Sequence, residues 1–274
     1  MLLSRQCKAP HNIKAGARAA FPRGLFQPVG SFRFSVDALL LGAFARSCRP
    51  RWSRFLDMGC GCGAVSFSLL LCDAPCPGQA WGIDIQEALV RAALHNAVTL
   101  GLDKVFQAER ADLADAKIWN FRVLPGFDLL AANPPYRLAG RGRVSADPLR
   151  RQALFGTDET LGIFIRAAAL AAAPGAIFCL VFPESRKEEL LLALVRENFQ
   201  PERLLSVQSR PQCPPSWILV AARKIDPPSA PVGAPVADQP LLLYAREKGP
   251  ALTGPAMEFC PYLGRDKLIA AAGL

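Results

Sequence analysis

Short apolar runs alternate with helical patterns along most of this chain, and this alternation limits the fold more than any other feature. Strands separated by helices are typical of a parallel sheet covered on both faces. The last two strand candidates lie close together, which indicates a hairpin. The sequence therefore predicts an α/β fold with a seven-stranded, mostly parallel, doubly wound sheet and helices on both faces. The predicted strands are 54–58, 80–85, 105–110, 127–132, 176–182, 204–208 and 217–222, and the predicted helices are 64–72, 86–100, 157–173 and 185–198.

The positive charge of the chain is concentrated at its N-terminal end. The formal net charge is +9, and residues 1–54 hold ten Lys or Arg and a single acid, Asp37. Basic and acidic residues balance in the remainder. A basic, acid-poor arm is typical of a protein that binds a polyanion such as RNA. A solvated tail and an organelle-import sequence are the alternatives.

Composition makes several functional classes unfavourable. Only two histidines are present, which disfavours a His-rich metal site or a Ser-His-Asp hydrolase. The nine cysteines are an odd number, follow no secretory signal and match no zinc spacing, so we expect reduced thiols, no metal and a cytoplasmic protein. The apolar stretch 162–182 contains Pro174 and Gly175, which predicts a buried helix, a turn and a strand, with no membrane span.

A glycine-rich turn follows the first predicted strand. Gly59, Gly61 and Gly63 alternate with Cys60 and Cys62 before a predicted helix. Glycines in such a turn let the backbone approach a ligand that a side chain would block. The spacing alone fits either a nicotinamide dinucleotide or S-adenosylmethionine.

Acidic residues at three successive strand ends favour S-adenosylmethionine. Asp57 precedes the glycines, where it would repel a pyrophosphate but could pair with the amino group of a methionine moiety. Asp84 ends the second strand and is expected to accept from the ribose hydroxyls. Asp112 follows the third strand and is expected to accept from the adenine amino group. Each acid taken singly could equally be a helix cap or a surface residue.

The fourth predicted strand leads into Asn133, Pro134, Pro135 and Tyr136. The two prolines end strand pairing and fix the backbone. The Asn133 side-chain oxygen and the Pro134 carbonyl could then bind both hydrogens of a planar amine, whose lone pair would face a methyl sulfonium. Tyr136 would stack on the planar group. These four residues are the predicted catalytic set.

The chain resembles the class I S-adenosylmethionine-dependent methyltransferases that act on planar amino nitrogens, and within them the bacterial tRNA1(Val) (adenine-37)-N6-methyltransferase family. The resemblance extends from about residue 24 to residue 210. Four segments carry it: GSFRFSVDALLL at 30–41, GIDIQ at 82–86, NPPYR at 133–137 and GRGR at 140–143.

The resemblance implies a Rossmann-like class I methyltransferase fold and methylation of adenine N6 in RNA, in the anticodon loop of a tRNA. It also implies that Phe34, Ser35 and Asp37 cover the methionine end of the cofactor. A cluster of arginines after the tetrapeptide is expected to hold RNA phosphates next to a flipped nucleotide. These are Arg137, Arg141, Arg143, Arg150 and Arg151.

Three competing functions remain open. Release-factor glutamine N5-methyltransferases use the same tetrapeptide on an amide, but they carry an N-terminal helical domain for which the roughly 50 residues before the first strand leave little room. DNA adenine methylation is disfavoured because no target-recognition domain is evident, and a non-catalytic RNA-binding module is disfavoured because the tetrapeptide is intact. We expect a monomer with an arm and cofactor-covering segment at 1–50, a methyltransferase domain at 51–225, and a Pro-rich linker with a C-terminal extension at 226–274.

Overall fold

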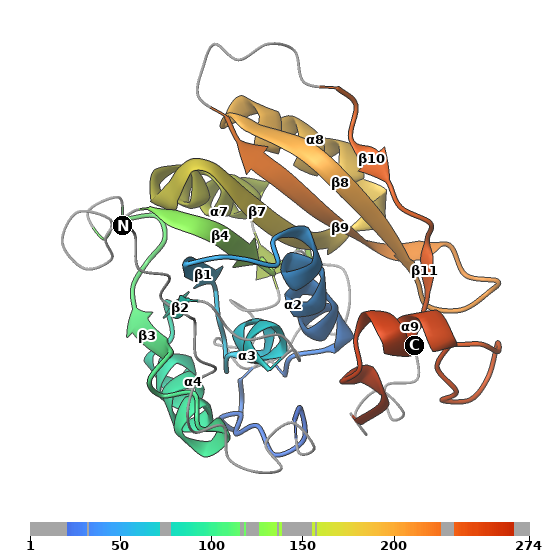
Figure 1. Cartoon of the computed structure of the whole chain (residues 1–274), viewed down its shortest axis with the longest axis horizontal. Coiled ribbons are helices and arrows are strands. Elements are labelled where there is room, and N and C mark those ends of the chain that lie inside the picture. The colour runs from blue at the N-terminus through green and yellow to red at the C-terminus, as the bar shows by residue number, and fades with distance from the viewer. Residues whose placement is uncertain are drawn as a thin grey trace, which may run out of the picture.

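The computed structural model describes residues 21–31, 33–71, 78–115, 118, 126–135, 137–138, 155–156, 158–225 and 233–265. A nine-stranded sheet runs through the molecule in the order β10-β8-β9-β7-β4-β1-β2-β3, and β11 also pairs with β8 (Figure 1). Its strands are β1 (Arg54–Met58), β2 (Gln79–Asp84), β3 (Phe106–Arg110), β4 (Phe127–Ala132), β7 (Ala172–Pro183), β8 (Phe199–Gln208), β9 (Pro215–Lys224), β10 (Val236–Ala237) and β11 (Leu241–Leu242). The helices are α2 (Val36–Cys48), α3 (Ala64–Leu70), α4 (Glu87–Leu100), α7 (Asp158–Ala171), α8 (Lys187–Arg196) and α9 (Gly254–Phe259).

The seven long strands have the predicted directions. β1 pairs in parallel with β2 and β4, and the pairs β2–β3 and β4–β7 are also parallel. β9 is antiparallel to both β7 and β8. The mostly parallel sheet with a C-terminal hairpin is therefore confirmed. The two-residue strands β10 and β11 lie outside the seven predicted strands.

Helices cover both faces of the sheet, because successive strand residues point to opposite sides. Phe55 and Leu129 pack with α2, α3 and α4 in one core cluster. Their neighbours Leu56 and Leu130 pack with α7 and α8 in the other. Figure 1 shows α2 and α3 on one face and α7 and α8 behind the sheet. The parallel strands, buried on both sides, thus bring their carboxyl ends to one edge of the sheet.

Helix α2 was missing from the predicted helices. It is buried along most of its length, and Leu39, Leu41 and Phe44 are fully buried. The apolar side chains of α2 lie on all sides of the helix, so its sequence lacks the one-sided pattern by which an amphipathic helix is recognised. Gly42 lets α2 pack closely on α3, since a Cβ there would lie 2.6 Å from the Ser68 Cβ.

The prediction of a turn at Pro174 and Gly175 is wrong, because both residues lie within β7. β7 already begins at Ala172, and its pairing with β4 shifts register between Phe127 and Leu129. Gly175 adopts a φ of +72° within this irregular start. The Pro-Gly pair therefore distorts the first part of the strand without separating the strand from α7.

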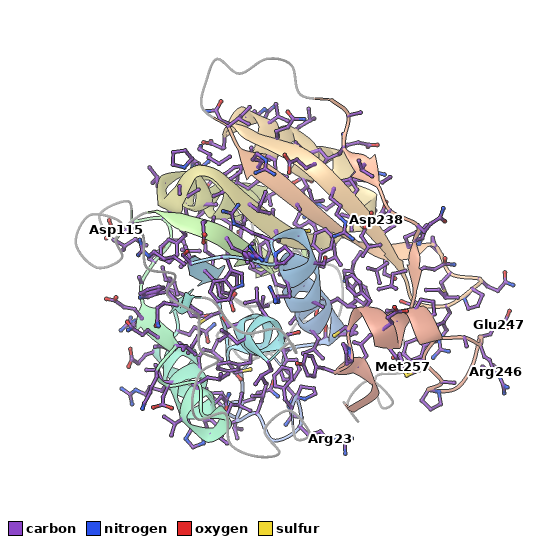
Figure 2. The ribbon with its side chains drawn as sticks, viewed as in Figure 1. Arg23, Asp115, Asp238, Arg246, Glu247 and Met257 are labelled. Atoms are coloured by element: carbon purple, nitrogen blue, oxygen red, sulfur yellow. The ribbon has the colours of Figure 1, made fainter. Side chains whose placement is uncertain are left out.

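The C-terminal segment lies at one end of the molecule, where Arg246, Glu247 and the α9 residue Met257 are exposed (Figure 2). Every described cysteine is free, namely Cys48, Cys60, Cys62, Cys179, Cys213 and Cys260. Within the described ranges, no three His, Cys, Asp or Glu side chains are grouped to hold a metal ion. No helix in this part of the chain is long and apolar enough to span a membrane.

Candidate functional site

The turn between β1 and α3 is the centre of the candidate site. Gly59, Gly61 and Gly63 adopt positive φ angles of +70°, +56° and +91°, which glycine takes up without steric strain. The Gly59 amide donates to the Ile83 carbonyl at 2.8 Å, so β2 holds the start of the turn. A Cβ on Gly63 would collide with the Phe67 ring, whereas a Cβ on Gly61 would meet nothing within 4 Å. Gly61 therefore faces open space through which a ligand can approach the backbone.

Asp57 lies near the end of β1 and is fully buried. Its Oδ2 accepts from the backbone amide of Ser66 at 3.1 Å and from the Ser66 hydroxyl at 2.6 Å. Its Oδ1 has no hydrogen-bond partner among the described residues. Burial disfavours the charged form and raises the pKa of Asp57 to about 7. The unpaired buried oxygen fits the cationic amino group expected from the sequence.

Asp84 and Asp112 follow at the ends of the neighbouring strands β2 and β3. Asp84 is 8% exposed and accepts from the amides of Gly61 and Gln86, each at 2.9 Å. Burial raises the pKa of the Asp84 carboxyl. A carboxylate has about four acceptor positions, so two remain for ligand hydroxyls. Asp112 is exposed and accepts from the Ala114 amide at 2.9 Å.

Asn133 meets the N-terminal end of α2 directly after β4. Its Nδ2 donates to Oδ2 of Asp37 at 3.2 Å, although the two residues are 96 positions apart. Asp37 is 1% exposed, and its Oδ1 accepts from the Ser35 hydroxyl and, at 2.9 Å, from the Ala38 amide. The next residue, Pro134, is buried. The structure therefore brings together two site residues that the sequence assigned to separate tasks.

The segment preceding α2 is tied to the glycine turn by one buried side chain. Asn96 of α4 is 1% exposed. Its Oδ1 accepts from the Phe26 amide at 2.7 Å, and its Nδ2 donates at 3.0 Å to the carbonyls of Phe26 and Cys62. Farther along the segment, the half-buried Phe34 packs against the core, and its amide donates to Gln27 Oε1 at 3.2 Å. This arrangement holds residues 21–31 and 33–35 beside the turn.

Asn96 was not among the predicted site residues. The available signal was an amide on the otherwise apolar buried face of α4, which includes Ala93, Ala97 and Leu100. A buried polar group on such a face needs hydrogen-bond partners, and residue type cannot specify that they come from a distant segment. His95, which precedes Asn96 in α4, is exposed and has an edge-to-face contact with Phe26.

Several predicted site residues lie outside the described part of the chain. For Arg137, only the backbone is described, in the two-residue strand β5 (Arg137–Leu138), which pairs in parallel with β6 (Phe155–Gly156). The others are Tyr136, Arg141, Arg143, Arg150 and Arg151. Their predicted roles stay predictions.

Several known methyltransferases are similar to this chain in sequence. No protein-family model matches the chain. The tRNA1(Val) (adenine(37)-N6)-methyltransferase of Photobacterium profundum is 27% identical over 200 residues, which are 72% of this chain and 80% of that protein. The protein of the same name from Musicola paradisiaca is 28% identical over 72% of this chain and 77% of its own length. These matches confirm the resemblance found in the sequence.

Three further proteins match a shorter part of the chain or have a lower sequence identity. The release factor glutamine methyltransferase of Rhodospirillum rubrum is 43% identical, but over 84 residues that make up 30% of this chain and 23% of that protein. The crystal structure of a predicted O-methyltransferase from Agrobacterium tumefaciens superimposes with a TM-score of 0.62 at 18% identity, over 83% of this chain and 97% of that one. A candidate class I S-adenosylmethionine-dependent methyltransferase from Listeria monocytogenes gives a TM-score of 0.55 at 15% identity, over 87% and 74%. The fold is therefore that of the class I methyltransferases.

Proposed function

We propose that this chain is an S-adenosylmethionine-dependent methyltransferase that methylates N6 of an adenine in RNA, with position 37 in a tRNA anticodon loop as its target. One observation carries the proposal. Asn133, Pro134 and Pro135 follow β4 at the same sheet edge as the glycine turn, Asp57 and Asp84. A planar amine bound by the first group would thus lie next to a cofactor bound by the second. The two tRNA methyltransferases described above supply the substrate class.

The residues at the ends of β1, β2 and β3 fit the proposed cofactor. Asp57 would face its amino group, Asp84 its ribose hydroxyls and Asp112 its adenine amine. Gly61 leaves room in front of the turn, and Asn96 holds the covering segment beside it. When bound, S-adenosylmethionine supplies a methyl group on a sulfonium, and the new nitrogen–carbon bond forms as the carbon–sulfur bond breaks.

The chain's own contribution to the reaction is alignment of the amine. The Asn133 side-chain oxygen and the Pro134 carbonyl each accept a hydrogen bond from the adenine N6 amine. The lone pair of the amine nitrogen is then directed at the methyl group. Tyr136 stacks on the base. No strong general base is required, because the extra proton can leave after the transfer. Alignment of this kind contributes up to about 7 to 11 kcal/mol in favourable cases.

RNA is proposed to bind across the arginine-rich segment that follows the tetrapeptide and along the basic N-terminal arm. Guanidinium groups bind phosphates and also stack on unpaired bases. We propose that the enzyme acts as a monomer in the cytoplasm.

The release-factor glutamine methyltransferase is the second candidate, because the 84-residue match is the strongest local identity among the relatives compared. Both functions are tested with the purified chain and labelled S-adenosylmethionine. The substrates are a tRNA1(Val) transcript with adenine at position 37, the same transcript with guanine there, and a release factor. We expect label in N6-methyladenine of the first substrate alone. Label in a release-factor glutamine would establish the second candidate instead.

Replacing Asn133 by Ala should lower the single-turnover rate by about 10- to 100-fold, the range expected when one hydrogen bond worth about 1–3 kcal/mol is lost in the transition state. Binding of S-adenosylhomocysteine, measured by calorimetry, should change by less than about twofold, since the amide acts on the target. Gln107→Ala removes an exposed amide from β3 and serves as the control. A near-normal rate in the Asn133 variant would place the active site elsewhere.

A further inference from the structure

We propose that Asp37 is a positioning residue that fixes the amide orientation of Asn133, so that the Asn133 oxygen, and not its nitrogen, faces the target amine. This inference rests on the proposed function. It assigns Asp37 a task different from the contact with the methionine end that the sequence resemblance implies. The two assignments lead to different kinetic consequences, which an experiment can separate.

The first support is the chemistry of the contact. An ionised carboxylate only accepts hydrogen bonds, whereas an asparagine amide has a donor end and an acceptor end. The Asn133 group 3.2 Å from Asp37 Oδ2 is Nδ2. The flipped amide would place its oxygen against the carboxylate oxygen, two acceptors without a proton between them. Asp37 thus selects one of two orientations that are nearly equal in shape.

The second support is the anchoring of Asp37 itself. Its side chain is almost fully buried, and its Oδ1 accepts from the Ser35 hydroxyl and the Ala38 amide. Both donors belong to the N-terminal end of α2, which is packed in the core. These contacts hold Oδ1 in place, and Oδ2 accepts from Asn133. A carboxylate held in this way can transmit the position of a rigid helix to the amide.

The third support is the pair of prolines after Asn133. An asparagine oxygen often accepts from the backbone N–H two residues later, which forms an Asx turn. Here that residue is Pro135, and the intervening residue is Pro134, so neither has an N–H. None of the described residues donates to Asn133 Oδ1. With Nδ2 bound to Asp37 and no local donor available, Oδ1 is left for the substrate.

The arrangement also indicates which targets the site accepts. The Asn133 oxygen and the Pro134 carbonyl are both acceptors, so a bound group must present two hydrogens. An exocyclic amine does so, whereas the keto oxygen of guanine or hypoxanthine would place a third acceptor between them. By holding the amide in this orientation, Asp37 contributes to selection of an amine over a keto group.

The test is a mutant cycle in the full chain, with single-turnover rates at saturating tRNA and cofactor, and S-adenosylhomocysteine binding by calorimetry. Asp37→Asn should lower the rate by about 10- to 100-fold, since the amide of Asn133 then loses its fixed orientation. Affinity for S-adenosylhomocysteine and the melting temperature should stay near the wild-type values. In an Asn133→Ala background, Asp37→Asn should have no further effect, because Asp37 acts through Asn133. Asp103→Asn, an exposed change of the same type, is the control.

A rescue variant separates loss of the amide orientation from any general structural effect of Asp37→Asn. In the double variant Asp37→Asn/Asn133→Asp, residue 37 can donate to a carboxylate at 133, which accepts on both sides and has no wrong orientation. This variant should recover at least about tenfold of the rate lost in Asp37→Asn. Failure of this recovery, multiplicative effects in the cycle, or weakened S-adenosylhomocysteine binding with a normal saturated rate would each overturn the inference.

The test of Asp37 can fail while the test of the proposed function succeeds, and the reverse also holds. The wild-type chain alone decides which substrate receives the methyl group. The ratios among the variants decide the role of Asp37, and they are measured on whichever planar nitrogen the wild-type chain methylates.

Discussion

Burial of the Asp57 carboxyl links the protonation of one residue to the stability of the whole fold. In the unfolded chain, an aspartate titrates near pH 3.9, whereas burial raises the pKa of Asp57 in the folded chain to about 7. Between these values the unfolded state has released its proton and the folded state has kept it. The free energy of unfolding therefore falls as pH rises from about 4 to about 7, and this contribution is constant above that range.

We expect Asp57→Asn to remove this pH dependence, because the amide does not titrate. A shift from 3.8 to about 7 corresponds to up to about 4 kcal/mol across the window. Denaturant unfolding between pH 4.5 and 7.5 measures the effect, with Asp103→Asn as the control that keeps the wild-type slope. Parallel stability curves for wild type and Asp57→Asn would show that Asp57 is charged in the folded chain throughout.

The sequence predicted the positions of the acids but not what they contact within the protein. Asp57 and Asp84 were located because strand ends and glycine turns have local signatures. The bond from Asn133 to Asp37 joins residues 96 positions apart, and no local pattern encodes such a pair. The same holds for Ser66, whose hydroxyl reaches Asp57 only because α3 turns back over β1.

Among the elements, α4 packs in the core and also holds the segment before α2 (residues 21–31 and 33–35), which we propose covers the cofactor. Asn96 satisfies the amide and carbonyl of Phe26 and the carbonyl of Cys62 at one point. These hydrogen bonds join residues 21–31 and 33–35 to α4 and to the glycine turn. One side chain of α4 thus fixes the position of this segment relative to the glycine turn.

Asn96→Ala should lower the free energy of unfolding by about 1–3 kcal/mol, because it leaves buried backbone groups without partners. It should also weaken S-adenosylhomocysteine binding, since the covering segment loses its attachment. Thr99→Ala is the matched control, because the Thr99 hydroxyl donates only within its own helix, to the His95 carbonyl at 3.0 Å. Unfolding and calorimetry measure the two effects. Unchanged binding in a destabilised variant would separate the segment from the cofactor site.

The sequence was informative for elements with a clear period or a strong terminator. β1 and β4 were predicted with their observed bounds, since each is a short apolar run ended by glycine or proline. α2 was missed because it is apolar on all sides. Its sequence therefore has no helical period, although the helix is buried in the core. The start of β7 was misplaced because Pro174 and Gly175 are strong turn signals that pairing with β4 overrides.

At the scale of the whole molecule, the uneven distribution of charge is the feature on which the proposed RNA binding depends. The basic excess lies in residues 1–54, and the arm residues Lys8, Lys14 and Arg18 fall outside the described part of the chain. Phosphate contacts release counterions, so each lost contact lowers the slope of log affinity against log salt by about 0.7 to 0.9. The arm is proposed to bind the RNA backbone without reading its sequence.

Replacing Lys8, Lys14 and Arg18 together by Gln should weaken tRNA binding and reduce its salt dependence, whereas the single-turnover rate at saturating tRNA should stay near wild type. Fluorescence anisotropy over a salt series measures the first effect and rapid quench the second. Replacing Arg141 and Arg143 should lower the saturated rate as well. Unchanged affinity and slope in the arm variant would favour the solvated-tail or import-sequence alternatives.

The outer side of β8 is not left bare. β10 and β11, each two residues long, pair with it in parallel at Arg203–Leu204 and Val207–Gln208. Asp238, which follows β10 and is labelled in Figure 2, forms a 2.7 Å ion pair with Arg203. An unpaired outer strand is a template on which another chain can add a strand of its own. By occupying this template with its own C-terminal residues, the chain is protected on this side against edge-to-edge aggregation.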